Sequence, residues 1–233
     1  MINELFFQAH IPESGRFLFD EEEAHHAIRT RRHQAGTVLY LTNGHGGLFS
    51  CRLLGKEVKK CELEVLHYEQ LSPIQPLLHL AVSPLKQEAR LEWIIEKAVE
   101  IGVSSITLLH CQRTEKTFPK LPRLERLMVA AMKQSLKCHL PALKGPVAFD
   151  KYLHNASGNV LLAHCAEGDK VVISKTALTF ENHLLIGPEG DFTTEEIALA
   201  AQKGVYFVTL GVERLRTETA ALVGLAEIKH ALR

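Results

Sequence analysis

Two glycine corners constrain the fold of this chain more than any other feature of its sequence. In residues 184–193 (LLIGPEGDFT) and again in residues 208–220 (VTLGVERLRTETA), an apolar run meets a glycine and a helical pattern begins a few residues later. Glycine lets the backbone turn sharply and approach a ligand closely, and the start of a helix offers unpaired N–H groups. We therefore expect two strand-to-helix corners that form a pocket for a flat, polar ligand held largely by main chain.

The first corner carries a helix-start signal. Thr193 and Glu196 form a capping-box pattern, so a helix should begin just after Gly190. Gly187 and Gly190 then lie in a turn at the carboxyl edge of a sheet, where open α/β folds bind ligands. An ordinary strand-to-helix turn is the alternative reading. It is the less favoured one, because a stiff proline and a carboxylate stand between the two glycines.

The segment 72–76 (SPIQP) divides the chain into two regions, because two prolines in five residues favour an extended linker. Residues 1–71 combine short strands, a glycine-rich hairpin at 43–47 and one helix at about residues 20–32, which predicts a small β-barrel. Residues 77–233 alternate strands and helices, which predicts a mostly parallel α/β sheet. The strands expected there are 77–82, 106–109, 159–165, 183–186 and 205–210, and the helices are a stripe near 91–99, then 121–138, 193–203 and 217–232.

Composition indicates a cytoplasmic protein with no membrane partner. No apolar run reaches the roughly 18 residues that a membrane helix needs, and the first residues lack the basic region of a signal peptide. The five cysteines are odd in number and irregularly spaced, which favours reduced thiols over a disulfide framework. Neither a paired-cysteine motif nor an H-E-x-x-H motif is present, so we expect no metal.

The charge is unevenly distributed although its sum is zero. Basic clusters of this kind are typical of proteins that bind a polyanion such as RNA. Solvation of helix faces is an equally weighted alternative on charge alone. The basic residues are Arg29, Arg31, Arg32 and His33 in one cluster, and Arg113, Lys116, Lys120, Arg123, Arg126, Lys133, Lys137 and Lys144 in the other.

The two corner motifs, GPEG at 187–190 and LRTETA at 215–220, resemble the paired cofactor motifs of the SPOUT class of RNA methyltransferases. Within that class the chain most resembles the small-subunit (16S) ribosomal RNA uridine-N3 methyltransferases, and the resemblance covers the whole sequence. Further matches are His25, His26, Arg29, Lys97, Glu100, Gly102, Val103, Gln134 and Ser135. The chain departs from the family at Asp191, where a glycine is usual, at Lys137, where an arginine is usual, and at Thr30 and Arg31, where the family has an apolar pair.

The resemblance implies a fold and a cofactor. The expected fold is α/β, with an N-terminal PUA-like RNA-binding β-barrel and a C-terminal SPOUT domain that contains a trefoil knot. S-adenosylmethionine is the expected cofactor, held in a bent conformation. The residues expected to bind it are Glu167, Ile186, Gly187, Pro188, Glu189, Gly190, Leu210, Gly211, Leu215, Thr217, Thr219 and Ala220.

The implied reaction transfers a methyl group to N3 of a uridine. Arg216 is expected to stabilise the negative charge that develops on the uracil oxygens. Glu189 or Glu218 is expected to orient or accept the N3 proton. A helix-dipole partner is an equally weighted reading of Glu218. Two alternatives stay open: an RNA-binding ribosome-assembly factor with a vestigial cofactor pocket, and a methyltransferase that acts on another RNA position.

The implied partners are small-subunit ribosomal RNA, free or within the assembled 30S subunit, and a second copy of the chain. RNA contacts are expected from His26, Arg29, Arg32, Arg126, Gln134 and Lys137. A homodimer is expected through the last helix, which is apolar almost all round from Ala220 to Ala226. The His164-Cys165 pair reads as a buried thiol beside a histidine at the rim of the sheet, not as a nucleophile with its base.

Overall fold

The computed structural model describes residues 2–115 and 119–232, so Lys116 of the basic segment lies outside it. The chain divides into two compact units, each described here by itself. Unit 1 comprises Met1–Pro73 and Val129–Leu140, and unit 2 comprises Ile74–Met128 and Pro141–Arg233. The division falls inside helix α3 (Leu121–Gln134), while the domain limits expected from the sequence (1–71, 72–76 and 77–233) stay predictions.

Unit 1 is built on a five-stranded sheet in the order β1-β3-β4-β5-β2. Its strands are β1 (Phe6–Phe7), β2 (Gly15–Leu18), β3 (Val38–Thr42), β4 (Gly47–Leu53) and β5 (Glu62–Gln70). β3 and β4 form the expected hairpin, with Thr42 opposite Leu48. Phe6, Phe19 and Phe49 are among the fully buried side chains of the core.

The N-terminal helix is shorter and more irregular than the sequence predicts. Asp20 caps it, accepting hydrogen bonds from the main-chain N–H groups of Glu22 and Glu23. Helix α1 (Glu21–His25) then widens into a π-helical turn, η1 (His26–Thr30). The chain leaves that turn at Arg32 with a φ of 61°. The expected helix from 20 to 32 therefore ends at residue 30.

The end of α3 and the residues after it belong to unit 1. Lys133 forms an ion pair with the buried Glu23 of α1. The carbonyl oxygen of Cys138 accepts hydrogen bonds from Gly46 N at 2.7 Å and from Thr42 Oγ1 at 3.2 Å. The segment 129–140 is thus fixed to the first sheet by main-chain and buried charged contacts.

Unit 2 contains a seven-stranded, fully parallel sheet in the order β10-β12-β9-β11-β6-β7-β8, which confirms the expected parallel α/β region. Its strands are β6 (Leu77–Val82), β7 (Ser105–His110), β8 (Ala142–Ala148), β9 (Asn159–Ala163), β10 (Val171–Val172), β11 (Glu181–Ile186) and β12 (Tyr206–Thr209). Its helices are α2 (Glu88–Ile101), the start of α3, α4 (Phe149–Asn155), α5 (Thr194–Gln202) and α6 (Thr217–Ala231). β8, β10 and α4 were not foreseen from the sequence.

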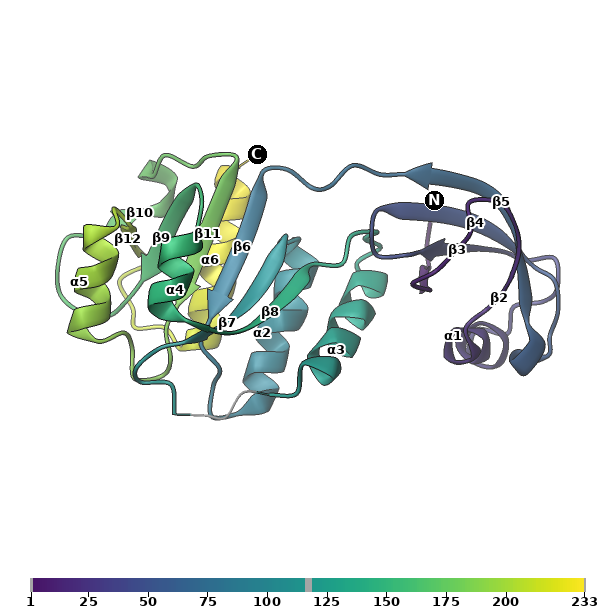
Figure 1. Ribbon diagram of the computed structural model, residues 1–233, viewed down its shortest axis with the longest axis horizontal. Helices are drawn as coiled ribbons and strands as arrows, with labels where there is room; N and C mark the ends of the chain where they lie inside the picture. Colours follow the sequence, from purple (N-terminus) through teal and green to yellow (C-terminus); the bar gives the residue numbers. More distant parts are fainter. Residues whose placement is uncertain (1, 116–118, 233) are drawn as a thin grey trace. The chain divides into compact units, whose positions relative to one another are not determined.

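Helices cover both faces of this sheet (Figure 1). α6 packs on α2, β6 and β11, while α4 and α5 share a core with the opposite-facing residues Ala81 and Leu185. The approach of α6 is close, because a Cβ atom added at Gly224 would lie 2.8 Å from Leu184 Cδ2. Glycine at this point of the helix therefore lets α6 lie against β11.

Three strand ends meet at one edge of the sheet. β12, β9 and β11 are neighbours in the sheet and run in the same direction, so their carboxyl ends lie side by side. The loops that follow Ala163, Ile186 and Thr209 therefore begin side by side at this edge of the sheet. Among the residues that the structure describes, no helix is long and apolar enough to cross a membrane.

Candidate functional site

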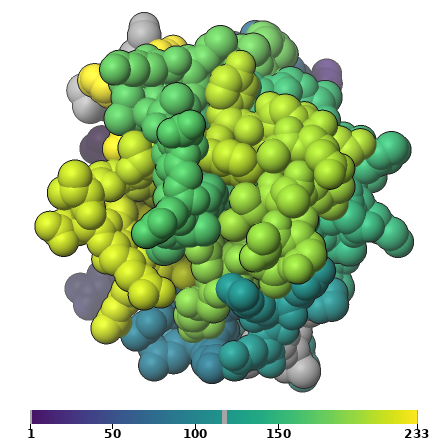
Figure 2. Space-filling view, turned by 90° about the vertical axis from the view of Figure 1, so that its left-hand side faces the viewer, coloured from purple at the N-terminus to yellow at the C-terminus, as the bar shows by residue number. Residues whose placement is uncertain are grey.

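A cavity of about 1050 Å³ opens at the carboxyl ends of β9, β11 and β12. Figure 2 shows the side of unit 2 that carries β10, β12 and α5, where the green segment after β9 lies between the yellow segment after β12 and the yellow-green α5. Three loops supply most of the wall: residues 163–166, 186–192 and 208–216. The sheet edge and the two glycine corners thus form one pocket, as the sequence predicts.

Side chains from outside the first glycine corner fix its shape. Arg113, just after β7, donates from Nη1 to the carbonyl oxygens of Gly190 at 2.8 Å and Phe192 at 3.4 Å. The Glu189 carboxylate accepts a hydrogen bond from Lys86 N at 3.1 Å. These contacts tie the 187–192 loop to the segments that follow β6 and β7.

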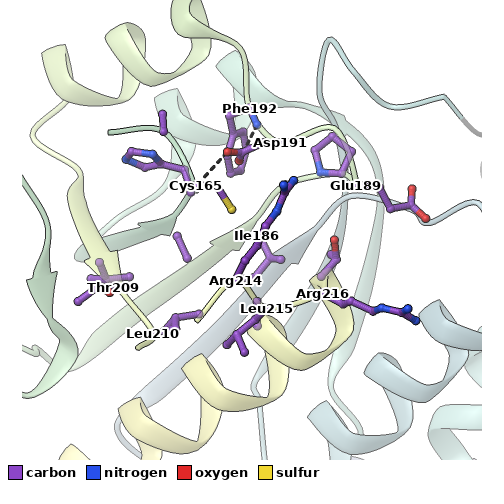
Figure 3. Close-up of a pocket in the computed structure, with 18 of the residues that line it drawn as sticks. Cys165, Ile186, Glu189, Asp191, Phe192, Thr209, Leu210, Arg214, Leu215 and Arg216 are labelled. Carbon is purple, nitrogen blue, oxygen red and sulfur yellow. Dashed lines mark hydrogen bonds between the residues drawn. The ribbon is translucent and has the colours of Figure 1, made fainter. Parts of the chain in front are cut away.

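Asp191 links two of the three loops. Its Oδ2 accepts a hydrogen bond from Cys165 N at 2.8 Å, and its Oδ1 accepts one from Phe192 N at 2.8 Å (Figure 3). Its φ of 63° lies in the left-handed region, which favours glycine and tolerates aspartate better than most residues. The position thus keeps the backbone that a glycine would adopt and adds a carboxylate that fixes the loop after β9.

The second corner leads into α6. Gly211 has a φ of 125°, which an L side chain rarely adopts. Arg216 is the N-cap residue of α6 but makes no side-chain capping bond, so its guanidinium is not used to start the helix. In Figure 3 the side chains of Arg216 and Glu189 extend to the same side of the pocket, away from Thr209.

Glu218 lies in the first turn of α6 and contacts a basic residue. Its Oε1 is 3.6 Å from Arg90 Nε of α2, and its side chain is only 17% exposed. This position is compatible with a helix-dipole partner, because it lies at the positive end of the dipole of α6. It is also compatible with a catalytic carboxylate, because Glu218 lines the cavity.

The expected burial of Cys165 is wrong, whereas His164 lies at the rim of the sheet as expected, in the cavity wall. Cys165 is exposed, while His164 is half-buried with its ring edge-on to Phe207. Burial, and then Lys170, lower the pKa of His164, which favours the neutral ring. Both ring nitrogens are buried and have no hydrogen-bond partner in the described structure.

Most of the predicted cofactor and catalytic residues line the cavity. These are Ile186, Gly187, Pro188, Glu189, Leu210, Gly211, Leu215, Arg216, Thr217, Glu218 and Ala220. Glu167, Gly190 and Thr219 neighbour lining residues without forming part of the wall. Arg90, Arg113, His164 and Asp191 line it but were not predicted. Arg113 had one usable signal, since it follows another strand whose carboxyl end lies at the same sheet edge.

The predicted RNA-binding residues fall in both units. His26, Arg29 and Arg32 lie on and after η1, and Gln134 and Lys137 lie in the 129–140 segment, all within unit 1. Arg126 is exposed on the part of α3 in unit 2. Two other members of the basic segment are already neutralised: Lys133 by Glu23, as described above, and Arg123, whose Nε lies 2.5 Å from Glu92 Oε1.

One group of side chains in unit 2 has the composition of a metal site, although the sequence contains no short metal-binding motif. His79, Glu181 and His183 each offer one ligand atom, and these atoms lie within 4.8 Å of one another. His79 is 102 positions from Glu181 in the sequence, a separation that no short motif reveals.

Two protein-family models match separate parts of the chain. An RNA methyltransferase domain model matches residues 72–229, and an RNA methyltransferase PUA domain model matches residues 19–66. The Ribosomal RNA small subunit methyltransferase E of Rickettsia conorii is 26% identical over 234 residues, covering 97% of this chain and 95% of that protein.

Two solved structures resemble the whole chain. A probable rRNA-methyltransferase from Porphyromonas gingivalis is 34% identical with a TM-score of 0.92, covering 98% of each chain. A Legionella pneumophila protein assigned as a methyltransferase, solved with the bound cofactor SAM, is 26% identical with a TM-score of 0.85, covering 99% of this chain and 98% of that one. The first family model alone spans more than half of the sequence, and the chain belongs to this family of RNA methyltransferases.

Proposed function

We propose that this protein transfers the methyl group of S-adenosylmethionine to N3 of a specific uridine in small-subunit ribosomal RNA. The observation that carries the proposal is the cavity of about 1050 Å³ formed by the two glycine corners, with Arg216 at its rim. The small-subunit ribosomal RNA methyltransferase from Rickettsia conorii supports the substrate, and the SAM-bound Legionella structure supports the cofactor.

The cavity suits a nucleoside cofactor. Its volume lies at the upper end of the range of about 300 to 1,000 Å³ that is typical of small-molecule pockets. Ile186, Leu210 and Leu215 offer apolar surface for a purine ring. The loop N–H and C=O groups offer hydrogen bonds to its polar edge. The residues present therefore fit S-adenosylmethionine.

The chemistry requires a positive group and a proton acceptor at the rim. When bound, the cofactor supplies an electrophilic methyl group: the S–C bond breaks, the N3–C bond forms and the N3 proton leaves. We assign Arg216 to stabilise the charge on the uracil oxygens. Glu189 is exposed and Glu218 is half-buried, so Glu189 is the more accessible of the two carboxylates for orienting or accepting the proton.

Replacement of Arg216 tests the catalytic assignment. We expect Arg216→Ala to slow methyl transfer by about 10²- to 10³-fold, the usual cost of losing one donor to a developing anion. Single-turnover methylation with saturating RNA measures this rate. Arg216→Lys is the matched control and should recover part of the rate, because it keeps the charge but not the planar fork. A normal maximal rate with weakened RNA binding in Arg216→Ala would make Arg216 a phosphate contact.

The competing functions are separated by two measurements. Calorimetry with S-adenosylmethionine distinguishes an enzyme from an assembly factor with a vestigial pocket, since only the enzyme should bind the cofactor. Mapping of methylated nucleotides in RNA from a deletion strain identifies the target position. Loss of a ribose 2′-O-methyl group or of a methyl group at another base position would replace N3 as the site of reaction.

The finer features of the resemblance are part of the same proposal. We infer a trefoil knot in unit 2, supported by the path of α6, which follows strand β12 and returns to pack on β6, β11 and the short helix η3 (Ile173–Lys175). We infer that the protein acts in the cytoplasm, where ribosomal RNA and the 30S subunit are found. Methylation assays on free RNA and on assembled subunits decide between these two substrates.

We also propose a homodimer through α6. Its outer face carries Thr219, Val223 and Ala226, which are exposed or half-buried side chains small enough for close helix packing. Ala221 and Leu225 are buried inside the protomer at 0% and 1% exposure, so a charge there should unfold the chain and leave the dimer untested. Ala226→Arg should give folded monomers by sedimentation. A wild-type chain that is monomeric and active at micromolar concentration would refute the dimer.

A further inference from the structure

We propose that His79, Glu181 and His183 form a binding site for a divalent transition-metal ion of the zinc class. All three lie at the amino ends of β6 and β11, which pair in parallel with His79 opposite His183. Glu181 and His183 are two residues apart on one strand and so point to the same face of the sheet. The register thus brings two imidazoles and one carboxylate together under α4.

Two of the three separations suit tetrahedral coordination, and the two imidazole rings, which are stacked with centroids 4.6 Å apart, would have to turn to bring both Nε2 atoms to one ion. Glu181 Oε1 lies 3.2 Å from His79 Nε2 and 3.6 Å from His183 Nε2. Two ligand atoms that are each about 2.1 Å from a tetrahedral zinc lie about 3.4 Å apart, so these separations bracket the expected value. Two histidines and one glutamate are also a known zinc ligand set that leaves a fourth position for water.

Both Nε2 atoms are buried and have no hydrogen-bond partner in the described residues. A buried polar atom without a partner is rare and normally has a cause, such as an ion. The Glu181 carboxylate lies close to both nitrogens, but neither approach has the geometry of a hydrogen bond. A metal ion bound at this point would satisfy both nitrogens and the carboxylate together.

A second layer of contacts holds each ligand. His79 Nδ1 is 2.7 Å from Ser105 Oγ, and His183 Nδ1 is 2.8 Å from Tyr152 Oη. Ser157 Oγ donates to Glu181 Oε2 at 2.7 Å. Metal-bound histidines usually donate their other ring N–H to a neighbour, which fixes the tautomer. With Nδ1–H donating to a hydroxyl oxygen, each Nε2 keeps its lone pair for the ion.

The site has its own electrostatic setting. Burial lowers the pKa of His79. Burial, and then the neighbouring His79, lower the pKa of His183. Both shifts favour the neutral form of the ring, which is the form that ligates metals. Lys144 of β8 is the nearby positive charge that acts on His79. Its repulsion opposes a cation, so replacing Lys144 by methionine should strengthen metal binding.

The site is separate from the cofactor cavity. It lies at the amino edge of the sheet, whereas the cavity lies at the carboxyl edge, and none of its ligands lines the cavity. The side chain of His79 is 15% exposed and that of Glu181 is 30% exposed, which leaves a route for the ion from solvent. A bound ion would connect β6 to β11 and, through Tyr152, to α4, so its role is to stabilise unit 2.

Titration of the full, chelator-treated chain with Co²⁺ tests the proposal, because tetrahedral cobalt absorbs visible light. We expect visible bands that saturate at one ion per chain and are displaced by Zn²⁺. His79→Gln and Glu181→Gln should lose them. Tyr152→Phe, which removes a single hydroxyl group, should weaken binding by about 10- to 100-fold. The matched control is His154→Gln, an exposed histidine on the same helix α4, which should behave as the wild type.

The proposal has clear points of failure. It is overturned if the wild-type chain gives no visible bands, or if His79→Gln keeps them. Should His79→Gln fail to fold, unchanged affinity in Tyr152→Phe overturns it instead. Binding of S-adenosylmethionine should be the same in the chelated and metal-loaded protein, because the cavity is at the other edge of the sheet.

Discussion

At the scale of single residues, Asp191 shows how one side chain replaces the backbone freedom of a glycine. The family pattern places glycine here, and the observed φ of 63° explains why. Aspartate meets the conformational cost with two hydrogen bonds to main-chain N–H groups, one of them across to Cys165. The substitution therefore gives the pocket an internal connection and does not mark its decay.

A series at Asp191 separates these two effects. Asp191→Ala should lower the free energy of unfolding by about 2 to 4 kcal/mol, because it loses both charged hydrogen bonds and keeps the left-handed strain. Asp191→Gly should cost about 1 kcal/mol less, because glycine removes the strain. Both should weaken S-adenosylmethionine binding by freeing the loop after β9. Denaturant unfolding and calorimetry measure the two quantities.

Asp191→Asn is the control for that series. Asparagine tolerates the left-handed region and keeps one acceptor oxygen, so it should stay nearest to the wild type. Equal stability of the alanine and glycine variants would show that backbone strain at this position is unimportant.

At the scale of elements, helix α5 fixes the first glycine corner through its N-terminus. Thr193 caps the helix, and the capping box that the sequence predicts is confirmed. The structure adds a contact that spacing alone does not reveal. Glu196 is 5% exposed, and its Oε1 accepts a hydrogen bond from Gln112 N at 2.9 Å while its Oε2 accepts one from Thr193 N at 2.9 Å. One carboxylate therefore joins α5 to the segment after β7.

Removal of that carboxylate should destabilise unit 2. We expect Glu196→Ala to lower the free energy of unfolding by about 2 to 4 kcal/mol, because two main-chain N–H groups lose a charged acceptor. Its neighbour Glu195 is exposed, so Glu195→Ala is the matched control and should change stability by less than about 0.5 kcal/mol. Thermal or denaturant unfolding measures both. Similar values for the two variants would contradict the bridging role of Glu196.

Helix α6 shows where composition alone misleads. Its apolar residues run almost all round, which suggests two buried sides. In the protomer, one side packs on α2, β6 and β11 through Ala221, Gly224, Leu225 and Ile228. The remaining face carries Thr219, Leu222, Val223, Ala226 and Glu227, which mix small, apolar and charged side chains and do not form a wide apolar stripe. Any dimer contact through α6 would involve this mixed surface.

At the scale of the whole molecule, the two units favour a division of labour. Five of the six predicted RNA-binding residues belong to unit 1, while the whole cofactor cavity is formed by unit 2. Phosphate contacts position a nucleic acid without reading its sequence. RNA affinity and cofactor affinity should therefore be separable by mutation.

Arg29 and Arg16 allow that separation to be measured. Arg29→Gln should weaken RNA binding and reduce its salt dependence by about 0.7 to 0.9 units of slope, the value for one lost phosphate contact. S-adenosylmethionine affinity should not change. Arg16→Gln is the control, because this arginine of unit 1 already contacts Glu64 at 3.7 Å. The assignment of Arg29 to RNA binding would be wrong if both variants kept the same salt slope.

The sequence by itself determined the local chemistry of this protein. Glycine corners, the capping box at Thr193, the two-proline linker and the alternation of strands and helices are set by neighbours in the chain, and local preferences determine them. The resemblance to the methyltransferases rests on the same short motifs. Eleven of the fourteen predicted cofactor and catalytic residues line the cavity for this reason.

Tertiary structure alone decided what depends on residues far apart in the sequence. Strand register brings His79 to His183, the sheet edge brings Arg113 and Asp191 into the cavity, and the 129–140 segment joins unit 1 through Gly46 and Cys138. Strand β8 was missed because Gly145 and Pro146 interrupt its pattern, and α4 was missed because its seven residues make only about two turns. Local periodicity reports which face of an element is apolar, whereas only packing decides what that face meets.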